Sequence, residues 1–241
     1  MAFSLPSCSS LQRATTCTAS VVLEQHEETE QSASAKRGQL IHAVIAAKLR
    51  GWEAPETGRY RLPVGEATMA ELSAKLGDGQ LLAELAMAYD GKRVRVLGEN
   101  AGRSSYLKGE LNGAADLVVV RDDALVADVK TGARDVEAPA GNWQIASLAL
   151  FVSMAYSVKS VTGMIAKLGR DGGWTFVEHR WSLADLAVVR ERLDAKVREW
   201  SEARLLHDAG FREPEQVPGV GCYFCKAHGC PHSRFSQKQA A

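Results

Sequence analysis

Residues 113–132 read GAADLVVVRDDALVADVKTG, and this stretch decides the fold. Two apolar runs rich in Val, Leu and Ala, at 114–120 and 124–130, flank the polar triplet 121–123. Apolar runs of this length joined by a short polar turn predict an antiparallel β-hairpin. The sequence therefore predicts a pair of buried strands near the middle of the chain.

Three charged residues interrupt this hairpin. Asp116 comes early in the first strand, whereas Asp128 and Lys130 come late in the second, so antiparallel pairing brings all three to one end. Residues 128 and 130 are two apart and point to the same face. Because charges are costly among apolar neighbours unless they are paired or bind metal, these side chains form a candidate site. A structural alternative stays open, in which Asp128 and Lys130 form a surface ion pair.

The chemistry of these side chains suits hydrolysis of a phosphodiester. A hard divalent cation such as Mg²⁺ or Mn²⁺ prefers oxygen ligands, and Asp116, Asp128 and the carbonyl of Val129 can supply them. Such an ion lowers the pKa of bound water and stabilises negative charge in the transition state. Lys130 would orient or help deprotonate the attacking water, or stabilise the developing charge.

Periodicity and turn signals predict the remaining elements. Apolar residues at helical spacing indicate a helix at 37–50, and a second helical stretch covers 68–89 with a break at 77–79. Ser182 and Asp185 form an approximate capping box at the start of a long helix that ends near residue 208. The other expected elements are a helix at 9–16, an apolar helix at 142–156, and strands at 94–97, 158–168 and 174–181. This mixture predicts an α/β sandwich.

Composition argues against some classes of protein. The 241 residues contain no apolar run of 18 or more and no recognisable secretory signal, so neither a membrane-spanning helix nor export is expected. We therefore expect a cytoplasmic protein with no membrane partner. Lys and Arg together number 29, as do Asp and Glu. That balance argues against binding nucleic acid by bulk charge but not against a basic groove.

The five cysteines lie towards the two ends of the chain, with none between residues 17 and 222. An odd number without an export signal argues against a disulfide framework. Three of them are packed into nine residues in the pattern C-x2-C-x4-C, which indicates metal ligands: Cys222, Cys225 and Cys230.

Spacing leaves two metals open for this cysteine set. Three thiolates with one imidazole are a common structural zinc site, and His232 or His228 would be the fourth ligand. Alternatively, Cys17 completes an all-thiolate site for a 4Fe–4S cluster. Spacing alone favours zinc, because both histidines are local.

The motif GAAD at 113–116, followed after eleven residues by DVKTG at 128–132, resembles the core of the PD-(D/E)XK nuclease superfamily. Within it, the chain is most similar to RecB-type nucleases, which include CRISPR-associated exonucleases that carry an iron–sulfur cluster. Here Asp128 stands where Glu is commoner, and Ala115 stands where the motif name has Pro. The resemblance implies a restriction-endonuclease-like mixed sheet flanked by helices, with a metal-stapled subdomain formed by the two chain ends.

The resemblance implies roles for residues outside the hairpin. The family has a His on an upstream helix a few residues after a Gly, and Gly38 with His42 fits, which makes His42 a metal ligand. It also has a Gln at the start of the helix after the lysine strand, and Gln144 fits, with a role in positioning the DNA or the lysine. Two weaker matches are Tyr156, later on that helix, and Glu99, chosen over Glu110 as the acid one strand before Asp116.

The same resemblance bears on the cysteines. Iron–sulfur nucleases of this type place one Cys near the N-terminus and three at the C-terminus, and residues 9–24 look like their N-terminal segment. This favours a 4Fe–4S cluster over zinc, with Cys17 as the fourth ligand and Cys8 unassigned. The implied organisation is a cysteine subdomain at 1–35 and 210–232, a nuclease core at 36–209, and a disordered tail at 233–241.

Together these features predict a metal-dependent DNA nuclease. The expected activity is a single-strand exonuclease in recombination, repair or phage DNA metabolism, with DNA and a separate helicase or recombination protein as partners. Two alternatives stay open: a non-catalytic DNA-binding or assembly subunit with the same fold, and a zinc-stapled interaction module.

Overall fold

The computed structural model describes residues 5–23, 32–58, 60–101, 105–132, 136–227 and 230–233. Within these ranges a six-stranded sheet has the strand order β2-β1-β3-β4-β5-β6. Its strands are β1 (Gln80–Tyr89), β2 (Val94–Glu99), β3 (Leu111–Val120), β4 (Ala124–Lys130), β5 (Ser160–Leu168) and β6 (Trp174–Ser182). Neighbouring strands are antiparallel except β4 and β5, which run parallel. A parallel pair needs a crossover connection, and helix α5 (Trp143–Ala155) provides it.

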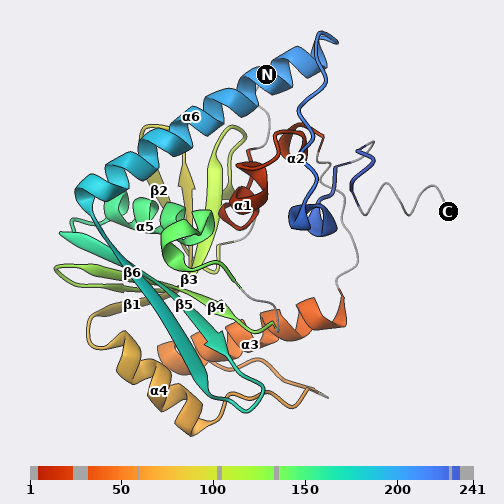
Figure 1. The fold of residues 1–241 in the computed structure, drawn as a ribbon. Helices are drawn as coiled ribbons and strands as arrows, with labels where there is room; N and C mark the ends of the chain where they lie inside the picture. Colours follow the sequence, from red (N-terminus) through yellow and green to blue (C-terminus); the bar gives the residue numbers. More distant parts are fainter. Residues whose placement is uncertain are drawn as a thin grey trace.

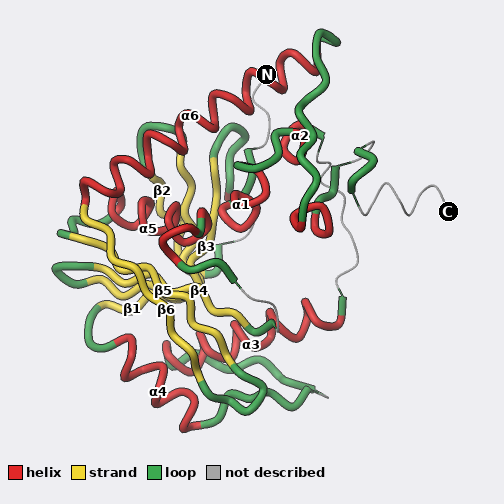
Figure 2. Tube along the Cα trace, viewed as in Figure 1, coloured by secondary structure: helices red, strands yellow, loops and turns green. Residues whose placement is uncertain are grey.

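Helices cover both faces of the sheet (Figure 1), and Figure 2 shows the same layers by element type. Helices α3 (Ala33–Arg50) and α4 (Glu66–Leu76) bury their apolar side chains against one face. Helices α5 and α6 (Leu183–Asp208) cover the other face. The shorter elements are η1 (Cys8–Ser10), α1 (Leu11–Ala14), α2 (Ala19–Val22), η3 (Pro139–Gly141) and η4 (Val220–Phe224). The predicted α/β fold, a mixed sheet flanked by helices, is confirmed.

Two helix starts are fixed by side chains that satisfy free backbone donors. The Ser182 hydroxyl accepts a hydrogen bond from the Asp185 N–H at 3.2 Å, and the Asp185 carboxylate accepts one from the Ser182 N–H at 2.9 Å. This is the predicted capping box of α6. At the start of α5, the Asn142 side chain accepts a hydrogen bond from the Gln144 N–H at 3.0 Å. The cap therefore fixes the helical turn from which Gln144 projects.

The sequence prediction is wrong for residues 80–89, which form strand β1 rather than the second half of a helix. The Leu, Ala and Glu residues of this segment favour a helix, but it lies between β2 and β3 and pairs with both. Gly79, at φ +141°, passes so close to β3 that a Cβ there would lie 2.7 Å from Val119. Tertiary pairing therefore overrides local helix propensity.

Asn112 and Gly113 lie inside β3, although an Asn-Gly pair is common in turns. A Cβ at Gly113 would lie 2.6 Å from Sγ of Cys8, so the glycine allows η1 to pack closely on the strand. Cys8 is 1% exposed, and burial raises the pKa of its thiol to about 12. Cys8, left unassigned by the sequence, is therefore a packing residue of the core.

Where the structure describes the chain, none of its helices is both long and apolar enough to span a bilayer. The predicted tail at 233–241 lies outside the described residues except for its first residue. That residue, Ser233, is buried, and its hydroxyl donates a hydrogen bond to the Cys225 carbonyl at 2.9 Å.

Candidate active site

The site forms where β1 and β3 break their regular pleat. The register on either side sets Glu84 opposite Asp116. Glu84 has a left-handed backbone at φ +51°, which costs on the order of 1–3 kcal/mol for a residue other than glycine. Ala83 packs in the core beneath α3 and α4, whereas Leu85 packs in the core on the opposite face. The strand therefore changes faces at Glu84, which turns this acid out of both cores.

His42 on α3 meets this kink. The ligating atoms of His42, Glu84 and Asp116 all lie within 4.8 Å of one another. Nδ1 of His42 is 3.1 Å from Oδ1 of Asp116 and 4.0 Å from Oε1 of Glu84. Gly38, one turn earlier on α3, allows this approach because a Cβ there would lie only 3.2 Å from Oγ1 of Thr131, just after β4. The structure thus brings together the predicted His42 and Asp116 and adds Glu84.

Strands β3 and β4 separate at the site. Their ladder ends with the pair Leu117 and Ala127, although β4 stays paired with β5 as far as Lys130. The Asp116 carboxylate then takes the place of a ladder acceptor, because its Oδ2 accepts a hydrogen bond from the Val129 N–H at 2.6 Å. Asp116 is therefore fixed with one oxygen on the backbone and the other towards His42.

The predicted residues Asp128, Lys130 and Gln144 form one connected group. Lys130 Nζ donates hydrogen bonds to Oδ1 of Asp128 at 3.0 Å and to Oε1 of Gln144 at 3.2 Å. Gln144 Nε2 donates to the same Asp128 oxygen at 2.9 Å. Nζ also lies 2.7 Å from Oδ2 of Asp128, so the ammonium forms an ion pair with this buried carboxylate.

The acids of the site repel one another. Burial and the Asp116 carboxylate raise the pKa of Glu84 to about 7. The same two causes raise the pKa of Asp128 to about 6, against the opposing effect of Lys130. Burial alone would lower the pKa of His42, but the surrounding carboxylates outweigh it and raise this pKa to about 9. Such a group of half-buried acids would be stabilised by a bound cation.

The residues present fit a hard divalent cation. Carboxylates of Glu84 and Asp116 converge with one imidazole, and the Asp128 carboxylate is close enough to interact with the charges of Asp116 and His42. Oxygen-rich sets of this kind, with at most one imidazole, suit Mg²⁺ or Mn²⁺. The contact that places Val129 is made by its N–H, so its carbonyl as a ligand stays a prediction.

Sequence reasoning missed Glu84 and selected Glu99 in its place. Glu99 lies on β2, where its carboxylate accepts hydrogen bonds from Arg50 at 2.9 Å and from the Ala83 N–H at 2.7 Å. These contacts tie Glu99 to α3 and β1 and account for its position without a metal. The sequence signal for Glu84 is a single acid in the apolar run LLAELAMAY at 81–89. Because the sequence predicts a helix for this run, the acid does not stand out as a residue on a strand of the site.

Tyr156, the other weaker candidate, directly follows α5, whereas Gln144 lies in its first turn. Twelve residues of helix separate the two by about 18 Å along the axis. Burial and, to a smaller extent, the Glu99 carboxylate raise the pKa of Tyr156. The structure therefore does not bring Tyr156 to the Asp128 group.

The cysteine segments from the two chain ends lie side by side (Figure 1). Sγ of Cys17 accepts a hydrogen bond from the Val217 N–H at 3.4 Å, and the Cys230 thiol donates one to the Gln216 side chain at 3.6 Å. Cys225 and Cys230 are buried, whereas Cys17 and Cys222 are half-buried. Among the described residues, no three cysteine sulfurs lie within 4.8 Å of one another. His232 is exposed, and His228 lies outside the described residues.

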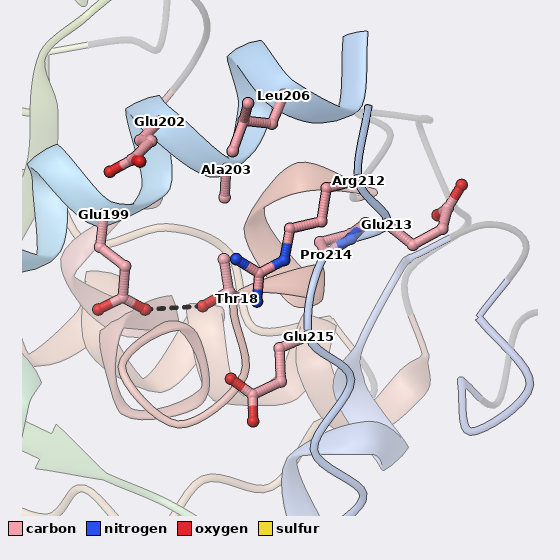
Figure 3. Close-up of a pocket in the computed structure, with 9 residues that line it drawn as sticks. All are labelled: Thr18, Glu199, Glu202, Ala203, Leu206, Arg212, Glu213, Pro214 and Glu215. Carbon is pink, nitrogen blue, oxygen red and sulfur yellow. Dashed lines mark hydrogen bonds between the residues drawn. The ribbon is translucent and has the colours of Figure 1, made fainter. Parts of the chain in front are cut away.

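A hollow of about 240 Å³ lies beside the C-terminal part of α6 (Figure 3). The Thr18 hydroxyl donates a hydrogen bond to Glu199 there at 2.8 Å. Four carboxylates stand around the Arg212 side chain and point in different directions: Glu199, Glu202, Glu213 and Glu215. Because these acids do not converge on one point, the hollow lacks the ligand geometry of the His42 group.

The fold and the site together define an α/β protein whose mixed sheet carries a candidate divalent-metal centre between α3 and α5. The chain belongs to the DUF2800 family, which is described as a family of proteins of unknown function and matches residues 4–241. No curated protein matches the chain.

Two solved structures are distantly similar to this fold. The crystal structure of SSO0001 has a TM-score of 0.42 and 15% identity, and the match covers 84% of this chain and 72% of that one. The crystal structure of a candidate exonuclease from Eubacterium rectale has a TM-score of 0.46 and 14% identity, with 88% and 84% covered. Identities this low do not transfer an activity.

Proposed function

We propose that this protein is a Mg²⁺- or Mn²⁺-dependent DNA nuclease of the PD-(D/E)XK, RecB-like type. The observation that carries the proposal is the convergence of six polar side chains from five elements: His42, Glu84, Asp116, Asp128, Lys130 and Gln144. Crowding acids in this way opposes folding, since their pKa values are raised. A group that destabilises the fold is better explained by ligand binding than by structure.

The residues divide into metal ligands and a positioned ammonium. His42, Glu84, Asp116 and Asp128 would hold the ion, which supplies an activated water and neutralises charge on the phosphate. Lys130 stands beside these acids, where its ammonium stabilises negative charge on the phosphate or orients the attacking water. Gln144 holds Lys130 in place, because it accepts a hydrogen bond from Nζ and donates one to Asp128.

The finer proposal is an exonuclease on single-stranded DNA in recombination, repair or phage DNA metabolism. A cytoplasmic setting and a separate helicase or recombination protein belong to the same proposal. A second candidate is a non-catalytic DNA-binding or assembly subunit. The position of Tyr156 favours this alternative, because the structure does not bring that side chain to the Asp128 group.

Cleavage of end-labelled single- and double-stranded DNA, with Mn²⁺, Mg²⁺ or a chelator, tests the proposal. Asp128→Ala should reduce cleavage to background, and Lys130→Ala should lower it by about 10²–10³-fold. The matched controls are Asp122→Ala and Lys159→Ala, which remove an exposed ion pair from the other end of the same hairpin. Cleavage retained in both site variants would refute the nuclease assignment, and binding without cleavage by the unaltered protein would support the alternative.

For the chain ends we propose a 4Fe–4S cluster held by Cys17, Cys222, Cys225 and Cys230, with Zn²⁺ as the alternative. Support comes from the chain ends, which lie side by side. Sγ of Cys17 accepts a hydrogen bond from the Val217 N–H, and the Cys230 thiol donates one to the neighbouring Gln216 side chain. Four cysteine thiolates are the usual ligand set of a 4Fe–4S cluster.

Anaerobic purification followed by metal analysis tests the cluster. The expected result is broad visible absorbance with about four irons per chain. Cys17→Ser should lose the absorbance, whereas Cys8→Ser is a control that changes packing only. A colourless protein with one zinc per chain would overturn the cluster and leave the nuclease proposal unchanged.

A further inference from the structure

A second hollow, of about 430 Å³, lies along α3, the helix that also carries His42. Its floor is made by alanines of the helix: Ala43, Ala46 and Ala47. Its wall is the segment 52–56, which doubles back beside α3 (Figure 1). The volume lies in the range of sites that bind small organic groups. We name this hollow, which Trp52 and Asn100 also line, the Trp52 pocket.

Trp52 is held in place at the end of α3. The helix ends at Gly51, whose left-handed backbone at φ +67° reverses the chain. The backbone N–H groups of Gly51 and Trp52 both donate hydrogen bonds to the Ala47 carbonyl, the second at 2.9 Å. The guanidinium of Arg50 lies 5.4 Å from the indole ring centre and is held by Glu99 at 2.9 Å. These contacts fix the position of the indole ring.

Trp52 differs from the other tryptophans in its exposure. It is 37% exposed, whereas the remaining four are buried or half-buried in the two cores: Trp143, Trp174, Trp181 and Trp200. An exposed aromatic side chain that lines a hollow is a suitable platform for an unpaired base, because every base has a π-face.

Asn100 links the Trp52 pocket to the metal centre. Its N–H donates a hydrogen bond to the Glu84 carbonyl at 3.0 Å. In the described chain, Glu84 at φ +51° and Asn100 at φ +56° are the two residues other than glycine with a positive φ. Backbone strain of this kind clusters at functional sites. Ala46 also lies one turn after His42 on α3. Helix α3 and the hydrogen bond between Asn100 and Glu84 therefore both connect the Trp52 pocket to the metal centre.

We propose that the Trp52 pocket binds an unpaired nucleobase next to the phosphodiester bond that the metal centre cleaves. The inference rests on the proposed nuclease function and names its substrate class as single-stranded DNA. Trp52 stacks on the base, and the Asn100 amide hydrogen-bonds its edge. Glu53 and Glu56 on the wall repel phosphate, so a neutral base is the occupant. A base inside a duplex has both faces covered and cannot stack there.

An abasic scan of single-stranded oligonucleotides tests this pocket. Each substrate lacks one base, at successive positions from the cleaved bond. For the unaltered protein, KM should rise by about ten-fold when the missing base is the one that fills the pocket. Trp52→Ala should raise KM on the intact oligonucleotide by about the same factor. In this variant, removing the base at the pocket position should cause no further rise in KM, whereas Trp52→Phe should keep most of that rise.

Two controls separate stacking from general damage. Phe211→Ala removes another exposed aromatic, which is 81% exposed near the end of α6, and should leave KM unchanged. Asn100→Gly removes the amide but tolerates the positive φ, and should change the preference among the four bases. The pocket proposal is overturned if KM in the unaltered protein does not depend on the position of the missing base, or if Trp52→Ala shows the same dependence as the unaltered protein. Cleavage in these assays would still support the nuclease proposal.

The same variants separate this inference from the nuclease proposal when no cleavage occurs. Oligonucleotide binding is then measured by fluorescence anisotropy in the unaltered protein, Trp52→Ala and Phe211→Ala. Binding that weakens about ten-fold in Trp52→Ala alone upholds the pocket although the nuclease proposal has failed. Equal binding by all three overturns the pocket as well.

Discussion

Two Asp–Lys pairs lie at opposite ends of the β3–β4 hairpin and have nearly the same geometry. Lys130 Nζ is 2.7 Å from Oδ2 of Asp128, and Lys159 Nζ is 2.8 Å from Oδ2 of Asp122. Their surroundings differ: the Asp128 side chain is 6% exposed, and that of Asp122 is 88% exposed. Ion-pair distance therefore does not identify a site. Burial and the convergence of further polar groups do, because they raise the cost of leaving a charge unpaired.

The largest expected effect is on cleavage. Asp128→Ala removes a proposed metal ligand and should lower the rate to background, and Lys130→Ala should lower it by about 10²–10³-fold. Asp122→Ala and Lys159→Ala should leave the rate within about two-fold, because an exposed pair contributes little. Rates are measured on the same end-labelled DNA. Equal losses at both ends of the hairpin would show that the pairs do not differ in function.

A second test concerns the acids beside Asp128. Mn²⁺ at about a hundred times its Kd should raise the Tm of the unaltered protein by about 5–10 °C, because ligand binding stabilises the folded state. Glu84→Gln should lose most of this shift, whereas Glu99→Gln should keep it, since Glu99 is engaged by Arg50. Thermal unfolding with and without Mn²⁺ measures both. The reverse pattern would restore Glu99, the acid chosen from sequence, to the metal site.

A third test asks whether burial alone marks a functional acid. Glu110 is 6% exposed and receives hydrogen bonds from Arg95 at 2.8 Å on each carboxylate oxygen. The Arg95 hydrogen bond, then the Leu107 N–H, hold the pKa of Glu110 below its usual value. We expect Glu110→Gln to lower Tm by about 3–10 °C without changing the rate per folded molecule.

This stabilisation should depend on pH with a definite sign. A carboxyl group whose folded pKa is depressed stabilises the fold above its unfolded pKa of about 4.3, and the effect is lost as pH falls through the folded value. The Tm difference between the unaltered protein and Glu110→Gln should therefore be constant at neutral pH and shrink below about pH 4. A difference that grows on acidification would contradict the assigned cause.

The smallest expected effect concerns the support of Gln144. Gln12 on α1 accepts a hydrogen bond from the Trp143 N–H at 3.0 Å, at the start of α5, and donates one to Glu137. Gln12→Met removes both and should lower kcat about three- to ten-fold with little change in KM. Gln12→Glu keeps the acceptor for Trp143 and should retain more activity. Equal loss in both variants would assign the effect to Glu137 instead.

Local signals in the sequence predict some elements of the fold correctly and others wrongly. The pattern of 114–120 and 124–130 predicted the hairpin, and Ser182 with Asp185 predicted the start of α6, because these signals are local. Residues 80–89 were assigned to a helix because Leu and Ala favour one, and their pairing with β2 and β3 is not encoded in neighbouring residues. That error concealed Glu84, since an acid on a helix gives no sign of facing a strand.

The sequence by itself determined the α/β class, the hairpin, and the residue types that gather at its end. Periodicity and turn chemistry act over a few residues, so they can be read without knowledge of the rest of the chain. Only the tertiary structure decided that Glu84 rather than Glu99 joins His42 and Asp116, and that one of two similar Asp–Lys pairs is buried. Both outcomes depend on strand register and on the backbone kink at Glu84, where φ is +51°. These features arise from contacts between segments that are far apart in the sequence.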